Sequence, residues 1–196
     1  ARQVPRDIHI SLTPPSRYNL GYDGLRNRQL YGKNDEPHKM FCFRIEGYVE
    51  TGLSKYEEEE NSDTSMIFKH PHGLVVPGEA IKTYFDSLAI DPKLDSYSLA
   101  VYVMNRLHED FCYKPNTTTL DTTAESAFQQ GHGVCQDFAH IYITLMHLSG
   151  LPARYVVGLI VGEGASHAWV EVLINGKWYG FDPTHNRIVN DEYIKI

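Results

Sequence analysis

The sequence of 196 residues has no excess of basic side chains and no long apolar run. Its 18 Lys and Arg stand against 25 Asp and Glu, which gives a formal net charge of −7. Nucleic-acid-binding proteins usually carry a basic face, and anionic membrane surfaces attract polybasic segments. No apolar stretch approaches the roughly 20 residues that cross a bilayer. We therefore expect neither a nucleic-acid partner nor a membrane partner.

A signal peptide is also missing from the sequence as it stands. The first residues, ARQVPRD, lack the apolar centre of such a leader. We therefore expect a cytoplasmic protein, with the alternative that a leader has already been removed. The composition, 42% hydrophobic and 22% charged, is that of an ordinary globular protein with enough apolar mass for a core. The length allows one large domain or two small ones.

Cysteine is scarce, with residues only at positions 42, 112 and 135. An odd number without a short C-x-x-C pair predicts neither a disulfide framework nor a zinc site. Cys42 lies in an alternating apolar stretch and Cys112 lies among aromatic residues. We expect both to be small buried hydrophobic residues. Cys135 has different surroundings.

Several histidines raise the alternative of a metal site. His132 lies three residues before a cysteine, His140 and His147 are separated by two helical turns, and His70 and His72 form a further pair. A zinc site needs three or four converging ligands. The simpler expectation is packed or hydrogen-bonded histidines within the helix and solvated ones at positions 70 and 72. We therefore expect no metal and no cofactor.

The first part of the chain has the pattern of β structure. Residues 8–12 alternate before a cluster of breakers, and residues 40–51 are rich in aromatic and β-branched residues. The pattern changes near the Val-Pro-Gly triplet that ends at residue 78. We predict a β-rich N-terminal region at residues 1–77 and a catalytic core at residues 78–196.

The second part of the chain predicts helices followed by antiparallel strands, which indicates the α+β class. Apolar residues recur at helical intervals, and Gly150 with Pro152 marks a helix end. Asn175-Gly176 is a strong hairpin signal. The predicted helices are 79–88, 96–107 and 135–148, and the predicted strands are 153–161, 168–174 and 177–181.

Cys135 lies at the predicted start of a helix, directly after a glycine-rich segment. Unpaired backbone N–H groups and the positive end of the helix dipole stabilise a thiolate at such a position. The glycines allow the backbone to approach a substrate carbonyl group. A thiolate near neutral pH is the nucleophile that attack on an acyl carbon requires. The sequence therefore predicts Cys135 as a catalytic nucleophile, although a cysteine at a helix start can also be inert.

His167 and Asp182 are placed to act with this cysteine. His167 precedes the Asn175-Gly176 turn by eight residues, and Asp182 follows it by six. If the two strands pair through that turn, both side chains lie near the same end of the hairpin. A carboxylate there can bind one imidazole nitrogen while the other nitrogen faces a thiol. The three residues therefore predict a Cys-His-Asp triad.

Four motifs occur in the order found in the bacterial transglutaminase-like superfamily. They are residues 131–140, 150–156, 167–172 and 181–184, and the resemblance extends over about residues 90–190. The resemblance implies a papain-like core, in which a nucleophile helix packs on an antiparallel sheet. It also implies Cys135 as nucleophile, His167 as general base and acid, and Asp182 as the residue that orients the imidazole.

The resemblance leaves the reaction open. Gln136 occupies the position where eukaryotic transglutaminases carry a tryptophan, which argues against protein cross-linking. The Cys135 backbone N–H is one expected oxyanion donor, and Tyr113 is a candidate second donor, with a half-buried structural role as the alternative. We expect Asp137 to stabilise the helix start. Compared with the family, the chain is expected to be clipped at both ends.

The first functional hypothesis is a thiol hydrolase that cleaves peptide or amide bonds, with a peptide or protein as substrate. The second is acyl transfer to an amine, as in true transglutaminases. The third is a catalytically silent binding module, which the presence of all three triad residues disfavours. We expect Trp169 and Trp178 to cover the catalytic hairpin as part of the core, with a place in a substrate groove as the alternative.

Overall fold

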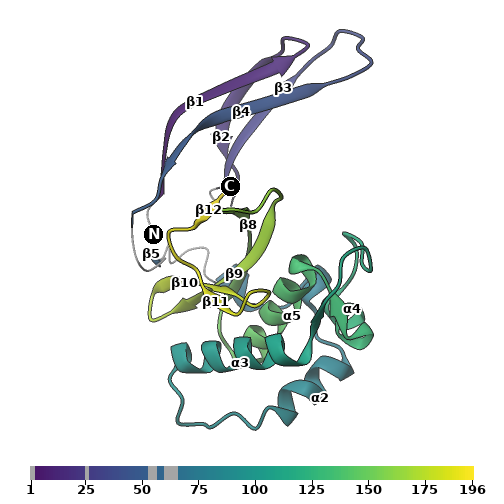
Figure 1. Ribbon diagram of the computed structural model, residues 1–196, viewed down its shortest axis with the longest axis vertical. Helices are drawn as coiled ribbons and strands as arrows, with labels where there is room; N and C mark the ends of the chain where they lie inside the picture. The colour runs from purple at the N-terminus through teal and green to yellow at the C-terminus, as the bar shows by residue number, and fades with distance from the viewer. Residues whose placement is uncertain (1–2, 25–26, 53–56, 60–65) are drawn as a thin grey trace. The chain divides into compact units, whose positions relative to one another are not determined.

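The chain is described by a computed structural model that covers residues 3–24, 27–52, 57–59 and 66–196. It forms two compact units, Gln3–Glu50 and Thr51–Ile196 (Figure 1). The boundary predicted after residue 77 lies inside the second unit, because the chain before it packs against the helices. Val75 is buried, and its carbonyl oxygen accepts a hydrogen bond of 3.2 Å from the Thr144 hydroxyl.

The first unit consists of β structure, as the sequence predicted. Two antiparallel ribbons form, in which β1 pairs with β4 and β2 pairs with β3. Neither ribbon is covered enough to bury its side chains, so that Phe43 and Tyr48 are both at least 70% exposed. The strands are β1 (Val4–Thr13), β2 (Arg17–Tyr22), β3 (Arg28–Lys33) and β4 (Cys42–Glu50).

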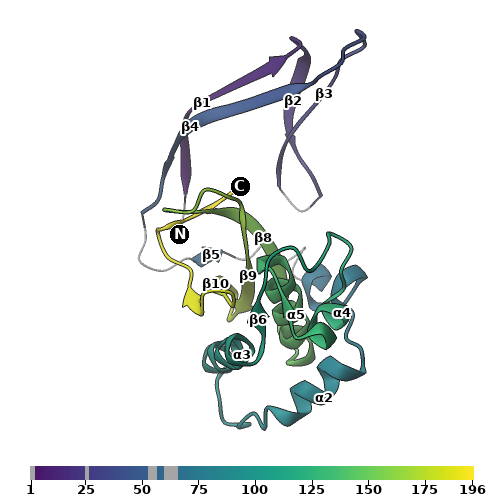
Figure 2. The ribbon, with the colours of Figure 1, turned by 45° about the vertical axis from the view of Figure 1, so that its right-hand side comes forward.

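The second unit contains the helices and a six-stranded sheet. In the sheet, the strands follow the order β11-β10-β9-β8-β12, and β5 pairs with β10. Helices α3 and α5 lie against this sheet, with α2 and α4 beyond them (Figures 1 and 2). The helices are η1 (Met66–Lys69), η2 (Gly73–Val75), α2 (Glu79–Ser87), α3 (Ser96–Asp110), α4 (Ala124–Gln130) and α5 (Cys135–Leu148). The strands are β5 (Glu57–Glu59), β6 (Cys112–Tyr113), β7 (His132–Gly133), β8 (Ala153–Ile160), β9 (His167–Ile174), β10 (Lys177–Asp182), β11 (Arg187–Ile188) and β12 (Tyr193–Lys195).

Helix α5 is the centre of the core. Every residue from Asp137 to His147 is buried, which is typical of a helix that is enclosed on all sides. Its apolar side chains pack against alternate residues of β9 and against the helices that surround it. The nucleophile candidate is therefore the first residue of a helix that is almost completely buried.

The hairpin of β9 and β10 turns at Asn175-Gly176, as predicted. Both residues have positive φ angles, 51° and 77°, which a two-residue hairpin turn of this kind requires. Lys177 pairs with Ile174, and the register continues to the pair of Phe181 and Val170. This register brings the start of β9 and the end of β10 to the same edge of the sheet.

A second, smaller apolar cluster was not predicted. It contains Trp169 from β9 and Tyr193 from β12, whose rings meet edge to face at 5.3 Å. Val156, Ile160 and Val189 complete it. Trp169 and Trp178 are both buried, so the expectation that they belong to the core is confirmed.

The expectation that Cys42 and Cys112 are buried was wrong, since both are exposed. Cys42 lies on a two-stranded ribbon whose faces are open, and Cys112 lies on a two-residue strand at the surface. Alternation of apolar residues predicts a strand but does not require a partner that covers it.

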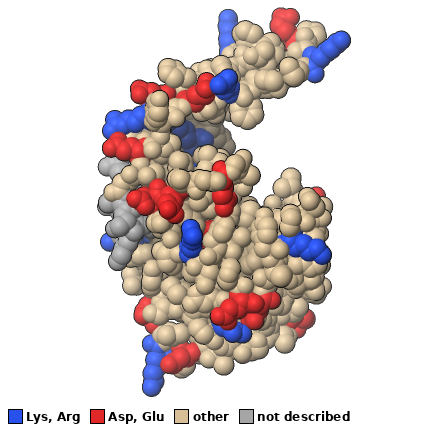
Figure 3. All heavy atoms as spheres, in the orientation of Figure 1, with Lys and Arg blue, Asp and Glu red and all other residues tan. Residues whose placement is uncertain are grey.

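The fold class is α+β, with a papain-like arrangement of a buried helix against an antiparallel sheet. In the described part of the chain, no helix is long and apolar enough to span a membrane. On the face of the second unit seen in Figure 3, basic and acidic side chains lie interspersed among uncharged ones. The absence of nucleic-acid and membrane partners stays a prediction.

Candidate active site

Cys135 is the first residue of α5 and is half-buried, so that its sulfur lies at the positive end of a buried helix. The helix start is held by Asp137, as predicted. Its Oδ2 accepts hydrogen bonds from the Val134 backbone at 2.7 Å and from the Thr118 hydroxyl at 2.6 Å. A β-carbon at Gly133 would approach the Asp137 side chain to 2.5–2.7 Å, so this position requires glycine.

His167 and Asp182 meet at the edge of the sheet, as the hairpin argument predicted. His167 Nε2 lies 2.9 Å from Asp182 Oδ2, and both side chains are buried. Cys135 is the second group, after Asp182, whose interaction raises the pKa of His167. Because His167 Nε2 faces the Asp182 carboxylate, Nδ1 is the ring nitrogen that is left to interact with the Cys135 thiol. The sheet and α5 thus bring together the three residues predicted from the sequence.

The surroundings of His167 favour its charged form. Burial alone would lower the pKa of this imidazole, but the hydrogen bonds to Asp182 and Cys135, together with their charges, outweigh burial and raise the pKa to about 9. At neutral pH the imidazole therefore holds a proton on each nitrogen.

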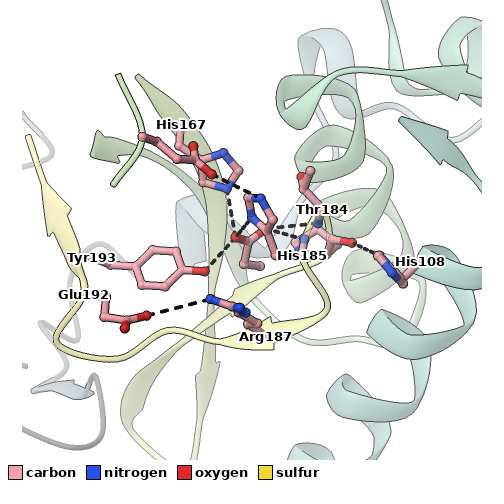
Figure 4. A network of polar contacts seen from close by, with 10 residues as sticks. His108, His167, Thr184, His185, Arg187, Glu192 and Tyr193 are labelled. Atoms are coloured by element: carbon pink, nitrogen blue, oxygen red, sulfur yellow. Dashed lines mark hydrogen bonds and ion pairs between the residues drawn. The ribbon is translucent and has the colours of Figure 1, made fainter. Parts of the chain in front are cut away.

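Asp182 is held by five donor groups from four residues, and the sequence analysis identified only His167 among these residues (Figure 4). Oδ1 accepts hydrogen bonds from the backbone N–H groups of Thr184 at 3.0 Å and His185 at 3.2 Å. Oδ2 accepts from the Tyr193 hydroxyl at 2.8 Å and contacts His185 Nδ1 at 2.8 Å, in addition to His167. These contacts fix the plane of the carboxylate and hence the direction of the imidazole.

The same contacts keep Asp182 ionised. Burial would raise the pKa of this carboxyl group, but the hydrogen bonds from His167, His185 and Tyr193 and the charge of His167 lower it below its ordinary value. Burial and the nearby Asp182 charge raise the pKa of Tyr193, so its hydroxyl remains a donor. The result is a fixed negative charge behind the imidazole.

His185 and Tyr193 are the functional residues that sequence reasoning missed. An Asp followed by Pro183 and Thr184 is typical of a turn in which the side chain binds its own backbone two and three residues on. That pattern could have predicted the contacts of Thr184 and His185 with Oδ1. No local signal indicates Tyr193, because its contact depends on β12 pairing with β8.

The remaining residues considered from the sequence lie around the helix start. Tyr113 on β6 pairs with Gly133 on β7, which precedes Cys135 by two residues. The Tyr113 side chain is 56% exposed. Gln136 donates through Nε2 to the carbonyl groups of Thr119 at 3.4 Å and Leu120 at 3.3 Å. These contacts join the loop after β6 to α5.

The histidines of α5 have ordinary surroundings. His147 Nε2 contacts the Phe68 carbonyl oxygen at 2.8 Å, and the His140 ring packs at 5.2 Å from that of Tyr155. Burial lowers the pKa of both imidazoles. Burial, and then the charges of Cys135 and Asp137, raise the pKa of Tyr155 to about 12, which leaves its phenol protonated beside the site.

The raised pKa of His167 beside Asp182 predicts that the stability of the folded protein depends on pH. The folded state raises the pKa of His167 to about 9, above an ordinary imidazole near 6.5. The stabilisation from this proton is therefore complete below about pH 6.5 and is lost as the pH rises through about 9. Urea unfolding should give a lower free energy at pH 9.5 than at pH 6. In His167→Gln this part of the decrease should disappear, and an equal decrease in both proteins would contradict the assignment.

Comparisons with known proteins show which proteins this chain is similar to. A family model described as the transglutaminase-like superfamily matches residues 87–183. An uncharacterized protein of Mycobacterium leprae is 37% identical over 94 residues, which cover 43% of this chain and 33% of that relative. An uncharacterized protein of Mycobacterium tuberculosis is 32% identical over 227 residues, which cover 100% of this chain and 72% of that relative.

A solved structure shares the fold. The crystal structure of a candidate cysteine protease from Cytophaga hutchinsonii superimposes with a TM-score of 0.72, covering 99% of this chain and 70% of that chain at 20% identity. At this identity the likeness concerns the arrangement of helices and strands.

Proposed function

Because the chain belongs to the transglutaminase-like superfamily, we propose that it is a cysteine-dependent acyl-transfer enzyme that hydrolyses peptide or amide bonds. The observation that carries the proposal is the contact of 2.9 Å between His167 Nε2 and Asp182 Oδ2, with Cys135 as the second group that raises the pKa of this imidazole. This is the arrangement of a nucleophile, a base and a residue that orients the base.

The proposed reaction begins with a thiolate at Cys135 and an imidazolium at His167. The sulfur attacks the acyl carbon, and the carbonyl oxygen becomes an oxyanion. His167 donates its Nδ1 proton to the leaving amine, which leaves an acyl group on Cys135. The neutral imidazole then takes a proton from water, whose oxygen attacks the thioester and releases the acid. Asp182 keeps its negative charge throughout and stabilises the imidazolium.

The oxyanion is proposed to bind at the start of α5. The first backbone N–H groups of a helix have no partner within the helix, which supports the Cys135 N–H as one donor. Tyr113 remains the candidate second donor, and its pairing with Gly133 supports a place near the nucleophile. A cytoplasmic location and a peptide or protein substrate are likewise proposals.

The choice between hydrolysis and aminolysis can be tested in one experiment. The protein is incubated with a peptide library and a small primary amine, and the products are identified by mass spectrometry, with Cys135→Ala as the control. Cleaved peptides with free acids support the hydrolase, whereas amine adducts on glutamine side chains indicate a transglutaminase. Neither product, together with no acyl adduct on Cys135, would contradict both and favour the binding module.

Cys135 should react with iodoacetamide at about pH 6 at least about 10-fold faster than Cys42 and Cys112. An ordinary thiol is only about 0.3% ionised at that pH, whereas the His167 imidazolium stabilises the Cys135 thiolate. Since Cys42 and Cys112 are exposed, accessibility alone would favour them. Peptide mapping after timed labelling measures the three rates. Equal rates in the folded protein would exclude Cys135 as the nucleophile.

A further inference from the structure

We propose that His167, Asp182 and His185 form a binding site for one divalent transition-metal cation, with Zn²⁺ as the probe, and that an ion bound there blocks the catalytic imidazole. Among the described residues, this is a group of three metal-ligating side chains whose ligand atoms all lie within 4.8 Å of one another. Binding itself does not depend on the proposed function, whereas the blocking effect does.

The distances of the three ligand atoms suit a tetrahedral ion. His167 Nε2 and His185 Nδ1 lie 2.9 and 2.8 Å from Asp182 Oδ2. Zinc bound to nitrogen and oxygen at 2.0–2.2 Å requires ligand atoms about 3.3 Å apart, so the two nitrogen–oxygen distances need to lengthen by only a few tenths of an ångström. The two imidazole nitrogens lie within 4.8 Å of each other. Two imidazole nitrogens and one carboxylate favour zinc or a similar transition metal over magnesium or calcium.

The outer contacts of the cluster are those of a ligating histidine. His185 Nε2 lies 3.2 Å from Glu163 Oε1, so a carboxylate is already placed on the ring nitrogen that faces away from the site. Metal-binding histidines usually have such a carboxylate, which selects the tautomer and orients the ring. Tyr193 and the two backbone N–H groups fix the Asp182 carboxylate in the same way.

The cluster is accessible from one side. His167 and Asp182 are buried, whereas the side chains of His185 and Glu163 are more than one third exposed. In Figure 4 the rings of His167 and His185 both point toward the shared carboxylate, and His185 comes from the loop after β10. An ion can therefore reach the cluster from solvent on the side of His185 and Glu163.

An ion at this site would inactivate His167. Binding displaces the proton from Nε2 to solvent, and the metal takes its place. The imidazole then loses its Nδ1 proton only by becoming an imidazolate, so it is a poor acid toward the leaving group and a poor base toward water. Asp182, now a metal ligand, no longer stabilises an imidazolium. Through His185, the loop after β10 would thus control the enzyme at the His167 nitrogen that faces Asp182.

Binding is tested on the whole chain after treatment with a chelator, by equilibrium dialysis against Zn²⁺. The expected result is one ion per chain, an affinity more than about 100-fold weaker in His185→Gln, and about 10- to 100-fold weaker in Glu163→Gln. His72→Gln, which removes an exposed histidine elsewhere, should bind as the native protein does. Unchanged binding in both His185→Gln and Glu163→Gln would overturn the site, as would no binding to the native chain.

Cobalt distinguishes this site from capture by the catalytic thiol. Cys135→Ala should retain the ion, and the native Co²⁺ complex should lack a thiolate-to-cobalt charge-transfer band. Loss of binding in Cys135→Ala would show that the ion sits between Cys135 and His167 instead. Once a substrate is known, Zn²⁺ should abolish turnover of the native enzyme but spare the residual activity of His185→Gln. If the ion binds as expected and no acyl transfer is found, the metal site stands and the proposed function fails.

Discussion

Asp182→Asn is expected to lower turnover by about 10⁴, with little loss of folding. The size is that found when the equivalent aspartate is changed in serine enzymes that use the same arrangement. The backbone N–H groups of Thr184 and His185 would hold the amide oxygen at the Oδ1 position. The amide nitrogen would then take the Oδ2 position and point its protons at His167 Nε2.

An amide in that position favours the wrong tautomer of His167. Nε2 would have to accept a hydrogen bond, so the proton of the neutral ring would move to Nδ1, where it faces the sulfur. Such a ring cannot accept a proton at Nδ1, and the imidazolium loses its counter-charge. The pH profile of Cys135 alkylation should therefore shift together with the loss of turnover, a change that a purely structural role would not cause.

The exposed residue Asp191 provides a matched control. Asp191→Asn removes the same charge from an exposed position and should keep the native rate and alkylation profile. Circular dichroism and urea unfolding check that Asp182→Asn remains folded. A near-native rate in Asp182→Asn would contradict a role for Asp182 in the triad. If Asp182→Asn is unfolded and as inactive as Cys135→Ala, the effect of the substitution is on the structure.

Trp169→Ala is expected to lower the free energy of unfolding by about 3–5 kcal/mol. Trp169 is 0% exposed, packs edge to face on Tyr193, and lies parallel to the His167 ring at 6.4 Å between centroids. Its removal leaves a large cavity in the small cluster that attaches β12 to the sheet. Because the β-sheet around this cavity is rigid, little of it can collapse.

Urea unfolding measures this change, with Val161→Ala as the control. Val161 is 70% exposed, and its substitution should change the free energy by less than about 0.5 kcal/mol. We also expect Trp169→Ala to reduce turnover, since Tyr193 would lose the packing that directs its hydroxyl to Asp182. A loss of less than about 1 kcal/mol would show that the cluster contributes little to stability.

Local patterning was sufficient for the main elements of the catalytic core. The helical spacing of apolar residues, closed by Gly150 and Pro152, predicted residues 135–148, which are the bounds of α5. The Asn175-Gly176 pair predicted the hairpin, since few residues other than Asn and Gly readily adopt positive φ angles at both turn positions. Register then follows from the turn, which is why the meeting of His167 and Asp182 could be predicted.

Burial was less predictable than secondary structure. Cys42 lies on a strand, as its neighbours indicated, but nothing in those neighbours states whether the ribbon will be covered. The chain before α2 likewise packs with the helices through Val75 and Thr144, a contact between residues 69 positions apart. Sequence periodicity reports which face of an element is apolar, whereas the partner that covers that face is set by the fold.

Tertiary structure decided the contacts of Asp182 Oδ2, whereas those of Oδ1 are local to its turn. Tyr193 reaches the carboxylate because β12 adds to the edge of β8, and His185 reaches it because the Asp182 turn bends the chain back toward His167. Glu163 meets His185 across 22 residues of sequence that include the whole β9–β10 hairpin. Periodicity in a sequence describes contacts between neighbours in one element, whereas these contacts join separate loops and strand edges. A candidate triad can therefore be predicted from its motifs, whereas Tyr193 and Glu163 are identified as parts of its surroundings only in the folded chain.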